Sequence, residues 1–320
     1  MSLMRALLVV ALAGCATSAG VTSLGDGRTG TFPILTITLP TVKGSVEQPA
    51  TVTGDLTLPA GASGRVPAVI VLHACSGVEP SVHAWAGELN RMGYAALVVD
   101  SFTGRGVKEV CTGRTSVNAG SRLADVFRAQ ELLATHPQID PNRIGVLGFS
   151  HGGWIALWAS QDIYQRIFMR GTAAPLAAYA AFYPIGCNAR LTNEADMDGG
   201  PVRIFHGTAD DWTAIDDCRE WAARRRAAGR NVSIVEYPGA MHGFDVASFN
   251  PPRRLPNVVN PSRCKISQQA DRTFVDADGK TFSGASPCVT RGASMGYDAR
   301  AHQQAIADVK AFLAEAFTRR

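Results

Sequence analysis

The pattern of apolar and polar positions predicts an antiparallel start followed by strands that are buried on both faces. FPILTITL (32–39) and ATVTGDLTLP (50–59) alternate apolar residues with polar or β-branched ones, which is typical of two antiparallel strands. VPAVIVLH (66–73) is instead a continuous apolar run, as expected for a strand covered on both faces of a sheet.

From this point strands and helices alternate along the chain. Further buried strands are expected at YAALVVD (94–100), RIGVLGF (143–149), LAAYAAFYP (176–184), PVRIFHG (201–207) and VSIVEYPG (232–239). Helices are expected over residues 83–92, 118–135, 152–160, 214–229 and 298–318. Because crossovers between parallel strands are right-handed, this order predicts an α/β fold with a mostly parallel sheet flanked by helices. We expect residues 31–320 to form a single domain.

Residues 246–297 interrupt the alternation. They contain NPPRRLP, several asparagines and serines and two cysteines, with little helical or long strand periodicity. Within them RTFVDADGKTF (272–282) predicts a hairpin that turns at Asp278–Gly279. We interpret the segment as an insertion into the α/β domain.

Composition narrows the class of protein only a little. The 320 residues are 46% hydrophobic and 18% charged, with a net charge of +4, which is ordinary for a globular protein. No apolar run approaches the roughly 18 residues of a membrane span. The basic residues are scattered except for Arg224–Arg226, which close a predicted helix where cations complement the dipole. We therefore expect no nucleic-acid partner.

The N-terminus predicts export. MSLMRALLVVALAGCATSAG has one early cation, a short apolar stretch and then small residues. Residues 12–15 (LAGC) resemble a bacterial lipobox, which makes residues 1–14 a lipoprotein-type signal peptide and Cys15 the lipidated N-terminus. Residues 15–30 would then be a flexible tether to the membrane of a bacterial cell envelope, facing the periplasm. The alternative is ordinary cleavage after Ala19.

Six cysteines remain after Cys15, an even number in an exported chain, which predicts disulfides in place of a metal site. Sequence alone allows 15 connectivities for six cysteines. Their local grouping suggests the pairs Cys75 with Cys111, Cys187 with Cys218, and Cys264 with Cys288.

GVLGFSHGGW (145–154) predicts a nucleophile. Its order is strand, sharp turn and helix, with Ser150 at the centre of a G-x-S-x-G turn. A serine hydroxyl is a weak nucleophile at neutral pH, so it needs a base within hydrogen-bond reach and a third group that orients the base. In an α/β sheet those partners should follow in the order acid, then histidine, at the ends of later strands.

Both partners are present in that order. HGTADDW places Asp210 just past one predicted strand, with Asp211 as an adjacent competitor, and YPGAMHGFD places His242 just past the next. We therefore predict a catalytic triad of Ser150, Asp210 and His242.

Acyl transfer also needs donors for a developing oxyanion. One is expected from the backbone N–H of His151, directly after the nucleophile. The other is expected from the loop HACSGV, where we assign the backbone N–H of Cys75. A disulfide at Cys75 would then hold the oxyanion loop in place.

With these residues identified, the chain resembles the dienelactone hydrolase family of the α/β-hydrolase fold. The resemblance covers roughly residues 50–245 and the last helix, on VIVLHACSG, GYAALVVDSFTGRG, RIGVLGFSHGG, HGTADDWT and YPGAMHGFD. It implies hydrolysis of carboxylic esters or lactones through an acyl-serine intermediate, with no metal or organic cofactor. It also implies that Arg105, in DSFTGRG, lies near the position of an arginine that contacts a substrate carboxylate.

The chain also departs from the family pattern. Dienelactone hydrolases proper use a cysteine nucleophile and a glutamate in the first oxyanion loop, where this chain has Ser150 and Ala74. It therefore resembles the serine-nucleophile branch of the family. The insertion at 246–297 leaves the loop that carries His242, so it is either a rim or lid over the pocket or a surface decoration.

Two other functions are compatible with the same residues. One is a peptidase or amidase that uses the same triad. The other is a non-catalytic envelope lipoprotein that binds a ligand.

Overall fold

A computed structural model of the protein describes residues 22–40, 46–114, 117–171 and 173–318. The predicted signal peptide at 1–14, the lipidation site Cys15 and the alternative cleavage site after Ala19 lie outside the described residues.

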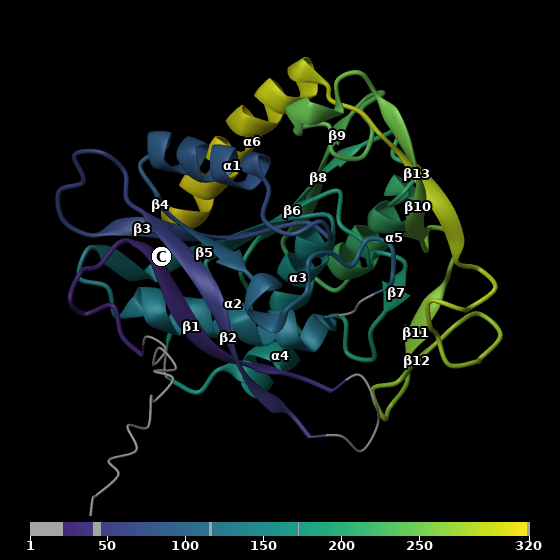
Figure 1. The fold of residues 1–320 in the computed structure, drawn as a ribbon, viewed down its shortest axis with the longest axis horizontal. Helices are drawn as coiled ribbons and strands as arrows, with labels where there is room; N and C mark the ends of the chain where they lie inside the picture. The colour runs from purple at the N-terminus through teal and green to yellow at the C-terminus, as the bar shows by residue number, and fades with distance from the viewer. Residues whose placement is uncertain (1–21, 41–45, 115–116, 172, 319–320) are drawn as a thin grey trace, which may run out of the picture.

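An eight-stranded sheet runs through the centre of the protein (Figure 1). Its spatial order is β1-β2-β4-β3-β5-β6-β8-β9. β2 pairs antiparallel with both β1 and β4, whereas β4, β3, β5, β6, β8 and β9 are parallel to one another. The strands are β1 (Gly30–Thr38), β2 (Gln48–Thr57), β3 (Val66–Leu72), β4 (Ala95–Asp100), β5 (Ile139–Phe149), β6 (Ala178–Phe182), β8 (Val202–Gly207) and β9 (Val232–Tyr237). The predicted antiparallel start and parallel continuation are confirmed.

Helices cover both faces of this sheet (Figure 1). One face packs against α1 (Pro80–Arg91) and α6 (Ala299–Thr318), and the other against α2 (Ala119–Ala134), α3 (His151–Ala159), α4 (Asp162–Phe168) and α5 (Ile215–Ala227). The prediction of an α/β fold flanked by helices is confirmed. Only the seven-residue α4 was not expected among these helices, because one or two turns leave little periodicity to read. In the described part of the chain, no helix combines the length and apolarity needed to cross a membrane.

The insertion forms one small sheet by itself and contributes two of the three strands of another, along the right-hand edge of Figure 1. β10 (Arg253–Asn260) pairs antiparallel with β13 (Thr290–Met295), and β11 (Ile266–Gln268) joins β12 (Phe274–Val275) to β7 (Ala189–Arg190). The predicted hairpin is present, because Asp276 N–H donates to Lys280 O and Val275 bridges to Thr281. The eight-residue β10 was not predicted, since its prolines and arginines hide any alternation.

Three disulfides join Cys75 to Cys111, Cys187 to Cys218, and Cys264 to Cys288. These are the pairs that the local grouping of cysteines suggested. The first connects the loop after β3 to the segment before α2, and the third closes a loop within the insertion.

The predicted tether at 15–30 is too long at its C-terminal end. Leu24 is fully buried in the core on the α2 face, and its backbone N–H donates to Thr135 Oγ1 at 2.7 Å, just beyond the end of α2. Gly30 already belongs to β1. Residues 24–30 are therefore part of the domain, because the Leu24 side chain, which has small and polar neighbours in the sequence, is buried in the core.

The prediction that Arg105 contacts substrate is wrong. Arg105 follows β4 in a short 3-10 turn, η1 (Thr103–Arg105), and its side chain is only 4% exposed. All five of its N–H donors have protein acceptors: two go to the carboxylate of Asp125 on α2, and the others to Ser101 O, Ile37 O and Thr38 Oγ1. Arg105 thus joins β1, η1 and α2 and has no donor left for a ligand.

Replacing Arg105 with Met should destabilise the fold without a specific effect on substrate binding. The Asp125 carboxylate would stay buried without its cation, and breaking a buried ion pair in this way costs about 3–5 kcal/mol. Denaturant unfolding of both proteins measures the difference. Unchanged stability together with a raised KM would restore the substrate-binding role.

Candidate active site

Ser150 lies on a strained turn between the end of β5 and the start of α3. Its backbone has φ 51° and ψ −107°, a conformation that a residue with a side chain adopts only when its surroundings enforce it. The Ser150 N–H donates to Phe182 O at 2.9 Å, which ties the turn to the end of β6. The hydroxyl is thereby presented at the carboxyl end of the sheet, as the G-x-S-x-G pattern predicts.

Two glycines allow this turn to form. A Cβ atom on Gly152 would lie 2.3 Å from Leu72 O at the end of β3, and one on Gly148 would lie 2.1 Å from Gly152 O. Both distances are shorter than any real Cβ contact. The backbones of β3, β5 and α3 therefore meet directly around Ser150, with no room for side chains.

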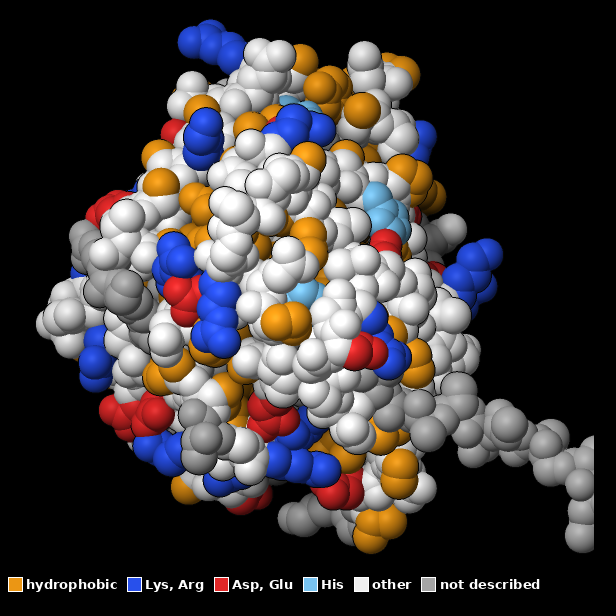
Figure 2. Space-filling model, turned by 90° about the vertical axis from the view of Figure 1, so that its left-hand side faces the viewer, with side chains coloured by type: hydrophobic (Ala, Val, Ile, Leu, Met, Phe, Trp, Pro, Cys, Tyr) orange, Lys and Arg blue, Asp and Glu red, His pale blue; other side chains and the backbone are white. Residues whose placement is uncertain are grey.

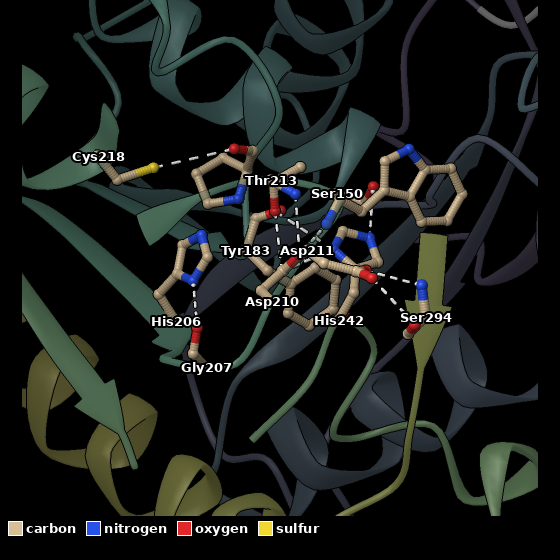
Figure 3. A network of polar contacts seen from close by, with 12 residues as sticks. Ser150, Tyr183, His206, Gly207, Asp210, Asp211, Thr213, Cys218, His242 and Ser294 are labelled. Carbon is tan, nitrogen blue, oxygen red and sulfur yellow. Dashed lines mark hydrogen bonds and ion pairs between the residues drawn. The ribbon is translucent and has the colours of Figure 1, made fainter. Parts of the chain in front are cut away.

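The three predicted triad residues meet at this end of the sheet (Figure 3). Ser150 Oγ lies 3.0 Å from His242 Nε2, and His242 Nδ1 lies 2.8 Å from Asp210 Oδ2. Asp210 comes from the loop after β8 and His242 from the loop after β9, so each side chain stands at the end of a different strand. This is the arrangement in which a histidine takes a proton from serine while a carboxylate fixes its tautomer.

The carboxylate of Asp210 is buried but well supplied with donors. Its Oδ1 accepts the backbone N–H groups of Trp212 and Thr213, both at 2.8 Å, and its Oδ2 also accepts the Thr213 hydroxyl. Burial by itself raises the pKa of Asp210, but the His242 ring and these hydrogen bonds outweigh it, so the pKa is lowered. Asp210 therefore stays ionised at neutral pH, where it can hold the Nδ1–H of His242.

Asp211 binds the insertion and not the imidazole of His242. Its side chain is about half exposed and accepts hydrogen bonds from the Ser294 backbone N–H and hydroxyl on β13 (Figure 3). Of the two adjacent candidates, the structure brings Asp210 and not Asp211 to His242.

Aromatic rings enclose His242. The centroids of Tyr183 and Trp212 lie 4.6 and 4.8 Å from that of the imidazole, which is only 1% exposed. The Tyr183 hydroxyl donates to Asp245 at 2.6 Å, and Trp85 Nε1–H donates to the other oxygen of the same carboxylate at 2.7 Å. Burial raises the pKa of Tyr183 well above its ordinary value, so the phenol keeps its proton and this contact. The imidazole is thus held in a fixed orientation away from water.

The two predicted oxyanion donors belong to residues that line the same cavity as Ser150. His151 is the first residue of α3, where backbone N–H groups have no partner within the helix, and Cys75 lines the same cavity as Ser150. Among the hydrogen bonds of the described residues, neither of these two N–H groups has an acceptor. The Cys75–Cys111 disulfide and the bond from Val110 N–H to Cys75 O fix the loop that carries one of them.

A buried arginine that was not predicted from the sequence joins the two segments that carry the predicted oxyanion donors. Arg122 on α2 is fully buried and donates through Nη1 to His151 Nδ1 at 2.7 Å and through Nη2 to His73 O at 2.8 Å. Burial lowers the pKa of His151 well below its ordinary value, as does the Arg122 charge, so the ring is neutral and accepts this bond. The sequence offered one indication of this role: Arg122 lies on the apolar side of the helix predicted at 118–135.

Two cavities open from Ser150, and the insertion lines both. One has a volume of about 1040 Å³ and includes Phe274, Phe282 and Val289 in its lining; the other has about 220 Å³ and includes Leu255 and Met295. Arg105 lines neither. The described part of the insertion thus forms part of the rim, so it is not only a surface decoration.

Neither metal-ligating clusters nor surface charge adds to the description of the candidate site. Among the described residues, no group of three or more His, Cys, Asp or Glu side chains lies close enough to hold a metal ion. On the face drawn in Figure 2, basic and acidic side chains of the described residues lie next to one another and do not gather into a patch of one sign.

The order of strands and helices, with a serine on the turn after β5, defines an α/β hydrolase. The model of the dienelactone hydrolase family matches residues 52–317, and the chain belongs to this family.

Two proteins of known sequence are similar to the chain. It is 26% identical over 211 residues to a Synechocystis sp. protein named "Putative carboxymethylenebutenolidase", covering 59% of this chain and 81% of that one. It is 25% identical over 201 residues to a Bradyrhizobium sp. protein named "Probable 2-oxo-3-(5-oxofuran-2-ylidene)propanoate lactonase", covering 57% and 75%.

A solved structure supports the same fold. The crystal structure of a dienelactone hydrolase named as putative, from Klebsiella pneumoniae, superposes with a TM-score of 0.54 at 18% identity, covering 89% of this chain and 99% of that one.

Replacing Asp210 with Asn should lower kcat for ester hydrolysis by about 10⁴-fold, because the amide would favour the wrong tautomer of His242. Asp211→Asn is the matched control and should change kcat less than about 10-fold, since the Asp211 carboxylate pairs with Ser294 and Arg254 of the insertion. Steady-state kinetics on one ester measures both. The opposite ranking would assign the role to Asp211.

Replacing Arg122 with Lys should lower kcat by about 10- to 100-fold with little change in KM. A lysine has one ammonium in place of a fork, so it cannot hold the His73 and His151 segments together. Loss of a whole oxyanion donor costs about 100- to 1000-fold, which sets the upper limit.

The control is Arg143→Lys, which alters an arginine paired with Asp140 away from the site. A kcat for Arg122→Lys equal to that of this control, in proteins of equal helix content, would show that Arg122 does not position the site.

Proposed function

We propose that the protein is a serine hydrolase that cleaves carboxylic esters or lactones through an acyl-serine intermediate. The observation that carries this proposal is the continuous chain from Ser150 Oγ to His242 Nε2 and from His242 Nδ1 to Asp210, at 3.0 and 2.8 Å. Membership of the dienelactone hydrolase family and the names of the two relatives, a butenolidase and a lactonase, support the same bond type.

The proposed reaction has two half-reactions. His242 takes the Ser150 proton as the serine oxygen attacks the carbonyl carbon, and the N–H groups of Cys75 and His151 stabilise the oxyanion. The protonated imidazole then gives its proton to the leaving alcohol oxygen, which releases the alcohol and leaves an acyl-serine. In the second half, His242 takes a proton from water, the hydroxide adds to the acyl carbon, and Ser150 leaves with the proton returned by His242.

We further propose that the enzyme works in the bacterial cell envelope, facing the periplasm and anchored by a lipid at Cys15. The export-type N-terminus and the lipobox resemblance support this location. The three disulfides also support it, because such bonds persist in oxidising compartments.

A fluorophosphonate probe followed by peptide mass spectrometry tests both proposals on the full chain. The probe should add to the Ser150 peptide and not to the Ser150→Ala variant, which should also lose hydrolysis of p-nitrophenyl acetate. The same peptide map should show an acylated N-terminal Cys15; an unmodified chain that starts at Gly20 would reject the anchor. Folded protein that neither reacts with the probe nor hydrolyses the ester would favour a ligand-binding lipoprotein.

A further inference from the structure

The two cavities at Ser150 differ about fivefold in volume and meet at the nucleophile. The large cavity holds about 1040 Å³ and the small cavity about 220 Å³, against about 300–1,000 Å³ for common ligand pockets. The residues that line both are Cys75, Cys111, Ser150 and Trp212. A substrate whose carbonyl sits at Ser150 therefore extends in two directions into spaces of unequal size.

The large cavity is apolar inside. Its lining includes the aromatic side chains of Trp154, Trp158, Phe168, Phe274 and Phe282. Its charged lining residues are exposed, as are Glu47, Arg170 and Arg272, or ion-paired, as is Arg128 with Glu131. Burying the hydrocarbon part of a ligand against such a wall is favourable by about 0.8 kcal/mol for each CH₂ group.

The catalytic base distinguishes the two cavities. His242 lines only the small cavity, whereas His151, one of the two proposed oxyanion donors, lines only the large one. In ester hydrolysis the protonated base must give its proton to the leaving alcohol oxygen, so the alcohol part lies on the side of the base. The acyl part then extends away from the base, past His151.

Resting on the proposed hydrolase function, we propose that the large cavity binds the acyl group and the small cavity the alcohol. The preferred substrates are esters of a long or bulky apolar carboxylic acid with a small alcohol. A long alcohol is disfavoured on this assignment: it would have to enter the much smaller cavity, and in the large cavity its oxygen would face away from His242.

Two isomeric esters test this assignment on the native protein. Ethyl octanoate and octyl acetate have the same formula and hydrophobic surface and differ only in which side of the ester carries the long chain. We expect kcat/KM for ethyl octanoate to exceed that for octyl acetate by at least about 10-fold, because even one methylene in a fitting apolar pocket contributes about 10- to 200-fold. Titration of the released acid at constant pH measures both rates.

A matched pair of variants places the effect in one cavity. Val289 lines the large cavity and Val246 the small one, and both are half-buried. Val289→Trp should lower the ratio of kcat/KM for ethyl octanoate to that for ethyl acetate by at least about 10-fold. Val246→Trp should leave this ratio within about threefold of the native value, since both substrates carry the same alcohol.

The outcomes separate this assignment from the proposed function. If the fluorophosphonate probe labels Ser150 and ethyl acetate is hydrolysed, but octyl acetate is cleaved as fast as ethyl octanoate or faster, the assignment of the cavities is overturned and the hydrolase stands. If Ser150 is not labelled and no ester is cleaved, the hydrolase and the assignment fail together.

Discussion

The close backbone contact among β3, β5 and α3 is the constraint on which the rest of the site depends. Because Gly152 lies against Leu72 O and Gly148 against Gly152 O, the helix begins directly above two neighbouring strand ends. This contact forces Ser150 into its left-handed conformation and points its hydroxyl out of the sheet. It also places the segment after β3 beside the first turn of α3, where the two proposed oxyanion donors can converge.

A line of buried charge on α2 holds this arrangement from the side. Asp125 binds Arg105 and the Thr36 hydroxyl on β1, while Arg122, one turn earlier, reaches His73 O and the His151 ring. Among the described residues, no carboxylate lies within hydrogen-bond distance of Arg122, and burial lowers its pKa to about 9. An apolar residue in the same space would avoid this cost in solvation, so we interpret Arg122 as a positioning residue for the segments that it joins.

The sequence predicted those features whose cause is local and missed those whose cause lies far along the chain. The succession of strands and helices along the chain and the Ser150 turn follow from runs of adjacent residues, and Asp210 and His242 follow from their positions after strands. Arg105 was misassigned because its partner Asp125 is 20 residues away on another element. Leu24 was missed for the same reason, because its place in the core is fixed by the end of α2, whereas β10 was missed because its prolines and arginines hide any alternation.

The insertion shows how a segment outside the parallel sheet shapes the space around the candidate site. It is joined to the catalytic loops at several points: Asp211 to Ser294, Trp212 Nε1–H to Val259 O, and Val259 N–H to Cys111 O. These bonds connect it to the loop of the triad aspartate and to the disulfide that fixes the Cys75 loop. Its side chains in turn line both cavities. In the proposed reaction, the triad breaks the ester bond, and the insertion, through its attachment to the same loops, limits which groups fit on either side of that bond.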